Sequence, residues 1–128
     1  MRNSAASLSG LSSDRDVWVY RSSTASLPII RNEELILIYA EANIQTDHLT
    51  EAVSALNTIR KGHGLVDYTG AVTKDALIAE MLNQRRYSLF YEGHRWIDMR
   101  RYEKLGDLPK DRPDDDVWSA MPIPNAEL

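Results

Sequence analysis

The residues best suited to chemistry lie close together, in the stretch Asn83–Tyr102. This stretch contains two carboxylates, Glu92 and Asp98, and a histidine, His94, which are the side-chain types of general acid and base catalysis. Such catalysis needs groups that converge on a pocket from different elements. These three residues lie on one local segment, so the catalytic interpretation is the weaker one.

A structural network of ion pairs is the alternative. Arg95 follows Glu92 by three residues and Arg101 follows Asp98 by three, so each acid can face a base along a helix. Large side chains spaced by three or four residues also place Arg86 on an apolar stripe. A buried arginine needs a carboxylate, because an unpaired buried charge costs several kcal/mol. We therefore expect a structural cluster of ion-pairing and core residues, comprising Arg86, Glu92, Arg95, Trp96 and Asp98.

Other site chemistries find little support in the sequence. The chain has no cysteine, and its three histidines have no partner at ligand spacing, so no metal and no cofactor are expected. The acidic run 114–116 lacks the glycine-punctuated spacing of a calcium loop. A net charge of −4 fits a nucleic-acid phosphate backbone poorly. No nucleotide-binding loop or nucleophile motif is present, so nothing in the sequence indicates an enzyme.

The chain divides by composition into two parts. Residues 1–27 contain eight serines and predict an irregular lead-in, with a short extended segment at Asp16–Arg21. In that segment Trp18 and Tyr20 alternate with valines and would face the same side. Exposed aromatic rings are a platform for sugars, although for these two a role in covering the helical core is the favoured interpretation. Trp118, in the apolar and proline-rich tail, is the third aromatic candidate for glycan binding.

The remainder, 28–128, predicts an all-α fold of about four helices. The expected helices are 32–45, 49–61, 74–92 and 94–103. The first two are separated by about three residues, which forces an antiparallel hairpin. Two such hairpins in succession indicate a helical bundle or repeat.

Helix ends and buried faces can be predicted from single residues. We expect Asn32 to cap the first helix and Thr73 the third. The second helix should stop at the glycines near Gly64. Gly93 should either break the helical run or allow another backbone to come close. The first helix should bury the face that carries Leu35, Ile38, Tyr39 and Ala42.

Four blocks of sequence follow one another in a characteristic order: Arg31–Ala42, Glu51–Arg60 with the following Gly64-Leu65, Glu92–Tyr102 and Met121–Glu127. Together they resemble the SusD/RagB family, the surface glycan-binding lipoproteins of Bacteroidetes. Two positions depart from the family pattern: Gln84 and Ser88 stand where it usually has Glu, which would thin any ion-pair network there. The resemblance covers roughly residues 28–128 and implies a tetratricopeptide-like helical scaffold.

The resemblance implies a non-catalytic protein that binds oligosaccharides or polysaccharides and delivers them to a SusC-like TonB-dependent transporter. It implies a cell-surface location at the outer membrane, with the full-length protein lipid-anchored. Because the chain lacks a lipid-bearing cysteine and an export signal, we expect it to be a fragment. Two alternatives remain: a helical-repeat module that binds a protein partner without sugar affinity, and a hydrolase that uses Glu92 and Asp98.

Overall fold

The computed structural model describes residues 2–8, 11–110, 112, 114–121 and 123. The chain divides into two compact units. One unit is Ser26–Arg95, and the other combines the segments before Ala25 and after Trp96. Each is described by itself.

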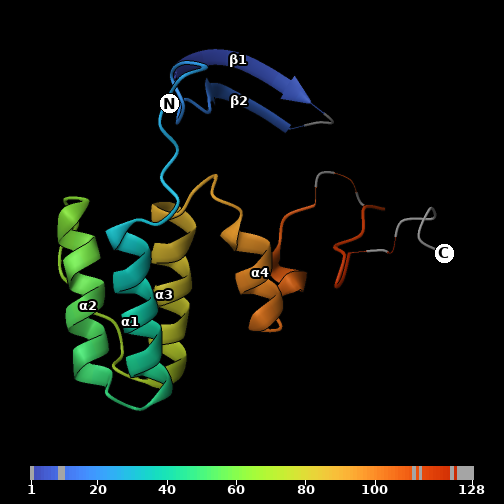
Figure 1. Ribbon diagram of the computed structural model, residues 1–128. Helices are drawn as coiled ribbons and strands as arrows, with labels where there is room; N and C mark the ends of the chain where they lie inside the picture. The colour runs from blue at the N-terminus through green and yellow to red at the C-terminus, as the bar shows by residue number, and fades with distance from the viewer. Residues whose placement is uncertain (1, 9–10, 111, 113, 122, 124–128) are drawn as a thin grey trace. The chain divides into compact units, whose positions relative to one another are not determined.

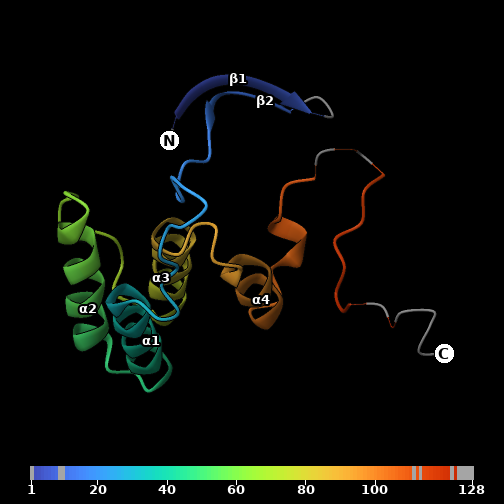
Figure 2. The same ribbon diagram turned by 45° about the horizontal axis from the view of Figure 1, so that its top comes forward.

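Three helices form the core of the unit Ser26–Arg95. They are α1 (Asn32–Gln45), α2 (Leu49–Gly62) and α3 (Lys74–Ser88), and each packs against the other two. In Figure 1, α1 and α2 form an antiparallel hairpin and α3 lies beside α1. The turned view in Figure 2 keeps the three helices side by side. The buried apolar side chains are Leu37, Ala40, Ile44, Ala52, Ala55, Leu56, Ile59, Leu77, Met81, Leu82 and Leu89.

The buried face of α1 differs from the predicted one. Leu37, Ala40 and Ile44 are buried, whereas Leu35 and Ile38 of the predicted face are about half exposed. Because apolar residues surround this helix, their spacing fits more than one stripe, and the choice is made by packing against α2 and α3. The predicted stripe was therefore wrong, although the helix has the predicted bounds.

The first two helices end in the same hydrogen-bonded motif. After α2, Gly64 has a φ of 73°, and the amides of Gly64 and Leu65 donate to the carbonyls of Lys61 and Arg60. This is a Schellman motif, in which a left-handed residue satisfies the last carbonyls of the helix. After α1, Asp47 takes the left-handed position with a φ of 61°. The predicted stop near Gly64 is confirmed.

The segment between α2 and α3 runs back along α2, so α3 starts at the same end of the unit as α2 (Figure 1). Two hydrogen bonds hold it there: Arg60 Nε donates to the carbonyl of Val66 at 2.8 Å, and the amide of Tyr68 donates to Asn57 Oδ1 at 2.7 Å. Thr73 caps α3 as predicted, because its hydroxyl accepts from the amide of Ala76. At α1, by contrast, the cap position is Arg31 rather than Asn32.

The helical run predicted to continue to Glu92 stops at Ser88. A short linker follows, with positive φ at Tyr91 (71°) and at Gly93 (82°). Glycine reaches this region at little cost, so Gly93 lies in the break between two helices rather than inside one. α4 then spans His94–Arg101.

The second unit contains most of α4, the 3₁₀ helix η1 (Leu105–Asp107) and two strands. The strands β1 (Arg2–Leu8) and β2 (Leu11–Asp16) pair antiparallel, with Leu8 opposite Leu11. The sequence did not predict this hairpin, because its strands are rich in serine and short of β-branched residues. The predicted all-α class is confirmed, with four α-helices among the described residues.

Candidate functional site

Charged and polar side chains from all three helices meet at one end of the unit Ser26–Arg95. Arg31 is at their centre: its guanidinium lies 3.1 Å from Glu33 and 2.8 Å from Glu92, and it also donates to the carbonyl of Ser88. His63, after α2, lies 3.4 Å from Glu33 and 3.3 Å from the hydroxyl of Ser88. We call these five residues the polar junction.

The linker geometry explains how Glu92 reaches this junction. Tyr91 and Gly93, on either side of it, both have positive φ, which turns the chain sharply at this point. The Glu92 carboxylate is thereby brought to Arg31, 61 positions earlier in the sequence. Glu92 therefore pairs with an arginine of another element. The prediction that it shares a helix with Arg95 was wrong, because α4 begins after it, at His94.

A serine, a histidine and a glutamate also meet in the junction, which are the residue types of a hydrolase triad. In a triad the serine contacts one ring nitrogen and the acid orients the other. Here Ser88 Oγ and Glu33 Oε1 both lie nearest to Nε2 of His63. Arg31 also engages Glu33, so this arrangement holds the helix ends together and does not assemble a triad.

A second polar network joins α2 to α3. Glu80 lies 2.5 Å from Arg60 and accepts a hydrogen bond of 2.8 Å from the side-chain amide nitrogen, Nε2, of Gln84. Gln84 and Ser88, the two positions at which the resemblance implies a Glu, are both buried. As neutral groups they add a hydrogen bond next to an existing carboxylate without adding a second negative charge.

The residues of the expected cluster have different surroundings, and only Glu92 belongs to one of these two networks. Asp98 is buried and lies 3.3 Å from Arg101, which confirms the predicted spacing of that pair. Arg95 is half-buried in the first turn of α4. Arg86 is exposed, with its guanidinium 5.7 Å from the ring centre of Tyr87, and its neighbour Arg85 is the buried arginine. The prediction of a buried Arg86 was thus wrong by one residue, although Leu82 and Leu89 of the same predicted stripe are buried. Packing against α1 and α2 selects the side of α3 that is buried.

Trp96 and Trp118 are joined by a hydrogen bond. The Nε1–H of Trp96 donates to the carbonyl oxygen of Trp118 at 2.9 Å, and the guanidinium of Arg100 lies 5.4 Å from the Trp96 ring centre. Trp96 is half-buried, whereas the Trp118 side chain is 59% exposed. The contact thus fixes the backbone at Trp118 and leaves its ring open to solvent.

The other two aromatic candidates follow the hairpin. β2 ends at Asp16, so Trp18 and Tyr20 lie in the irregular segment after the strand, and both are exposed. Val17 and Val19 are exposed as well, so the alternation in the sequence does not separate a buried side from an open one. Most of the closing motif Met121–Glu127 lies outside the described residues.

The described residues contain neither a cluster of metal-ligand side chains nor a helix suited to span a membrane. No three histidine, aspartate or glutamate side chains in these parts of the chain gather as they would around a metal ion. No helix within the described ranges has the length and apolar character needed to cross a membrane.

Comparison with known proteins identifies the family. The sequence model of the SusD family matches residues 6–127. The chain belongs to the SusD family. A SusD-like protein from Formosa agariphila is 30% identical to this SusD-family chain over 115 residues. The match covers 78% of the chain and 23% of that relative, so the chain spans about a quarter of its length. No solved structure matches the chain.

The polar junction shows which site residues the sequence reasoning missed. Arg31 stands in a block that resembles the family, but its partner Glu92 is in another block, and no spacing rule connects them. His63 was considered only as a metal ligand. The helix bounds contained a signal for the junction. When α1 packs antiparallel to α2 and α3, its start lies beside the ends of the other two helices.

Proposed function

We propose that this SusD-family chain is part of a non-catalytic glycan-binding protein of a Sus-like polysaccharide uptake system. Membership of the family carries the proposal. In this function the protein binds oligosaccharides at the cell surface and delivers them to a SusC-like TonB-dependent transporter. The full-length protein would be held at the outer membrane by a lipid anchor.

The absence of catalysis is part of the proposal. Glu92 contacts Arg31, and Asp98 contacts Arg101, so each candidate carboxylate is engaged by a guanidinium. These contacts support an architectural role for both acids.

We propose Trp118 as the principal sugar contact, with Trp18 and Tyr20 as further candidates. A sugar ring packs its apolar C–H face on an aromatic ring, which must be exposed and held in place. The Trp118 ring is exposed, and its carbonyl is held by Trp96. Trp96 is a poorer platform, because the guanidinium of Arg100 lies near its ring.

Affinity electrophoresis through gels that contain single polysaccharides tests the proposal. We expect at least one polysaccharide to retard the chain, Trp118→Ala to abolish the retardation, and Trp118→Tyr to preserve part of it. Tyr87→Ala is the matched control, because Tyr87 is an exposed aromatic on α3. A folded chain that no polysaccharide retards, or retardation that survives all three substitutions Trp18→Ala, Tyr20→Ala and Trp118→Ala, would contradict it.

A second candidate function is a helical module that binds a protein partner. The exposed apolar face of α1 favours it, because such a face is typical of a protein contact rather than of a sugar site. The second function excludes sugar affinity, so a folded chain that forms a stable complex with a protein partner and that no polysaccharide retards would favour it.

A further inference from the structure

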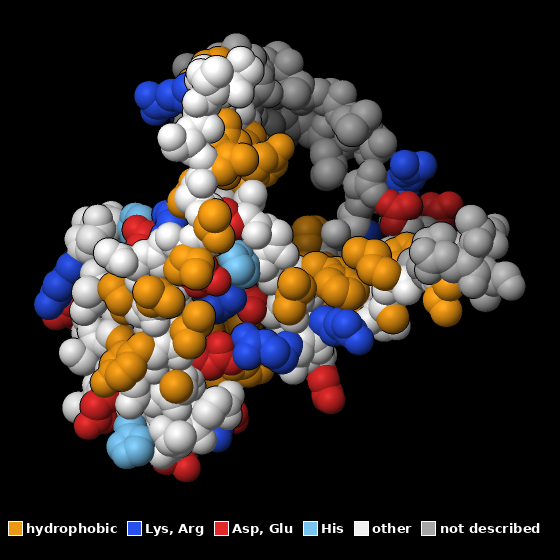
Figure 3. Space-filling model, in the orientation of Figure 1, with side chains coloured by type: hydrophobic (Ala, Val, Ile, Leu, Met, Phe, Trp, Pro, Cys, Tyr) orange, Lys and Arg blue, Asp and Glu red, His pale blue; other side chains and the backbone are white. Residues whose placement is uncertain are grey.

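The side of α1 that faces away from the core is as apolar as the buried side. Leu35, Ile38 and Tyr39 are 52%, 48% and 56% exposed, and with Ala42 they recur at the spacing of one helical face. We call these four residues the open face. Figure 3 shows apolar side chains gathered over this part of the molecule. A helix that is apolar all round is normally covered all round.

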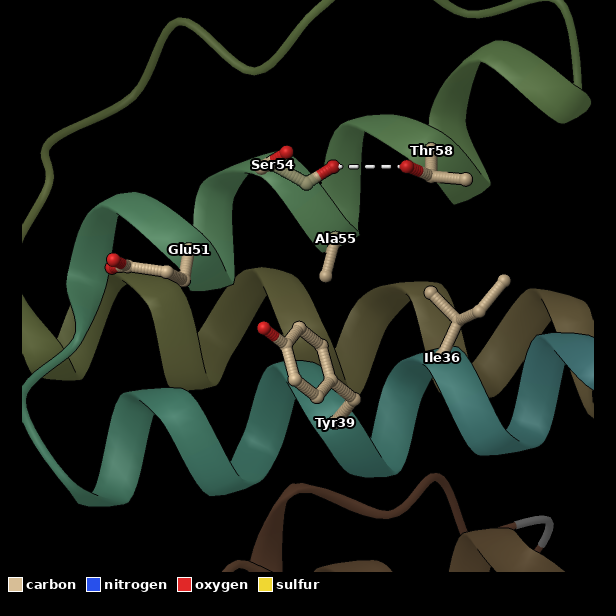
Figure 4. A pocket seen from close by; sticks show the side chains of 6 residues that line it. All are labelled: Ile36, Tyr39, Glu51, Ser54, Ala55 and Thr58. Atoms are coloured by element: carbon tan, nitrogen blue, oxygen red, sulfur yellow. Dashed lines mark hydrogen bonds between the residues drawn. The ribbon is translucent and has the colours of Figure 1, made fainter.

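A shallow groove continues the open face toward α2. It has a volume of about 300 Å³ and lies between Ile36 and Tyr39 of α1 and the facing side chains of α2. In Figure 4, Ile36 and Tyr39 point toward α2, and Ala55 points back toward α1. Ala55 leaves room at the floor of the groove, where a side chain from a further helix would fit between the ridges of α1 and α2.

The charges around the groove restrict the occupant. Among the six residues that line it, Glu51 alone is charged, and its side chain is exposed. α1 contains three glutamates and no lysine or arginine. If a second copy docked through its own α1, carboxylates would lie near carboxylates, and a partner with lysine or arginine beside its apolar residues would pair with them instead.

The length of the family relative supplies a source for such a helix. More than three quarters of the Formosa agariphila protein lies outside the region that this chain matches. A stacked helical hairpin cannot bury all its apolar surface alone and relies on neighbouring units of the same polypeptide. The open face has the composition of a surface between such units.

We propose that the open face and the α1–α2 groove bind one amphipathic α-helix, which belongs to the part of a SusD-like polypeptide outside the matched region. This helix carries apolar residues at intervals of three and four, which pack on Leu35, Ile38 and Tyr39. A lysine or arginine at the edge of its stripe pairs with Glu51. The inference concerns a surface that the proposed glycan contacts do not include, so it stands or falls independently of sugar binding.

Peptide binding tests this directly. Fluorescein-labelled synthetic peptides of about 20 residues, roughly 30 Å as helix, would be tiled across the unmatched part of the Formosa agariphila protein. Their fluorescence anisotropy would be titrated with the full 128-residue chain. We expect at least one peptide with apolar residues at helical spacing and a flanking basic residue to bind.

Variants of the chain then locate the binding. Ile38→Gln with Tyr39→Gln should weaken the affinity at least about tenfold, and Glu51→Gln by a smaller factor. Tyr87→Gln is the matched control, because it removes an exposed apolar ring from α3, and it should leave the affinity unchanged. Circular dichroism would establish that every variant is as helical as the parent chain.

Three outcomes would overturn the proposal. The first is that no peptide binds the folded chain. The second is that binding is equally strong in the open-face variants. The third is self-association of the chain, measured by sedimentation equilibrium, that the open-face substitutions abolish, because this would assign the surface to a second copy.

Discussion

The two faces of α1 have nearly the same composition and different environments. Leu37, Ala40 and Ile44 are fully buried among three helices, whereas Leu35 and Ile38 are half exposed on the opposite side. The comparison teaches that residue type alone does not identify the core side of an apolar helix. The polarity of neighbouring elements and the directions of packing decide it.

The largest difference between the two faces should appear when leucine is truncated on each. Leu37→Ala removes a fully buried side chain and should cost about 3 kcal/mol of unfolding free energy, from the lost burial and the cavity that remains. Leu35→Ala, the matched change on the open face, should cost about 1 kcal/mol or less. Urea unfolding followed by circular dichroism measures both. Equal losses would show that the two faces are not distinct.

The polar junction at the start of α1 should show the next largest effect. There the guanidinium of Arg31 contacts two carboxylates and holds the start of α1 to the end of α3. Arg31→Met removes contacts to Glu33, Glu92 and the carbonyl of Ser88, and should cost about 2 kcal/mol because hydrogen bonds to charged groups are lost. Arg31→Lys keeps the charge without the planar fork and should lose less. Thermal unfolding of the three proteins would reveal the order. If Arg31→Met melts with the parent chain, the junction contributes no stability.

One substitution at the end of α1 should raise the stability of the chain. Asp47 occupies the left-handed position of the Schellman motif, where a residue other than glycine is strained. Asp47→Gly should therefore stabilise the chain by about 0.5–1 kcal/mol. Gly64→Ala, at the equivalent position after α2, should destabilise it by a similar amount. The denaturation midpoint should rise for Asp47→Gly and fall for Gly64→Ala. A lower midpoint for Asp47→Gly would contradict the assignment of Asp47 to the left-handed position of the motif.

The smallest effect is expected on the open face itself. Ile38→Gln exchanges an exposed apolar side chain for a polar one with good helix propensity, so the unfolding free energy should change by less than about 0.5 kcal/mol. Denaturant unfolding of the isolated chain would establish this. A loss as large as that of Leu37→Ala would mean that Ile38 contributes to the core of this chain.

Much of the helical layout was predictable from local signals. The bounds of α1 were predicted as observed, those of α2 to within one residue, and the start of α3 from Thr73. The Thr73 cap and the glycine stop after α2 were predictable because such signals act over a few residues, whereas the predicted Asn32 cap of α1 was wrong. The buried arginine was placed one residue away, at Arg86 instead of Arg85. A shift of that size is decided by the neighbouring helices, which the local sequence does not specify.

The polar junction was less predictable from the sequence. Its contacts join α1, α2, α3 and the linker across large separations, and only the packed structure brings Arg31 to Glu92. The hairpin of β1 and β2 was also missed, because its polar strands carry neither alternation nor β-branched residues. The sequence identified Trp18, Tyr20 and Trp118 as aromatic candidates, but it could not predict that their side chains are exposed.

The most direct measurement compares three proteins in one polysaccharide-containing gel: the parent chain, Trp118→Ala and Ile38→Gln. The account assigns sugar to the aromatic surface and a helix to the open face of α1. It predicts that the parent and Ile38→Gln are retarded equally and that Trp118→Ala migrates freely. Retardation that Ile38→Gln abolishes and Trp118→Ala preserves would contradict it, because the sugar would then bind at α1.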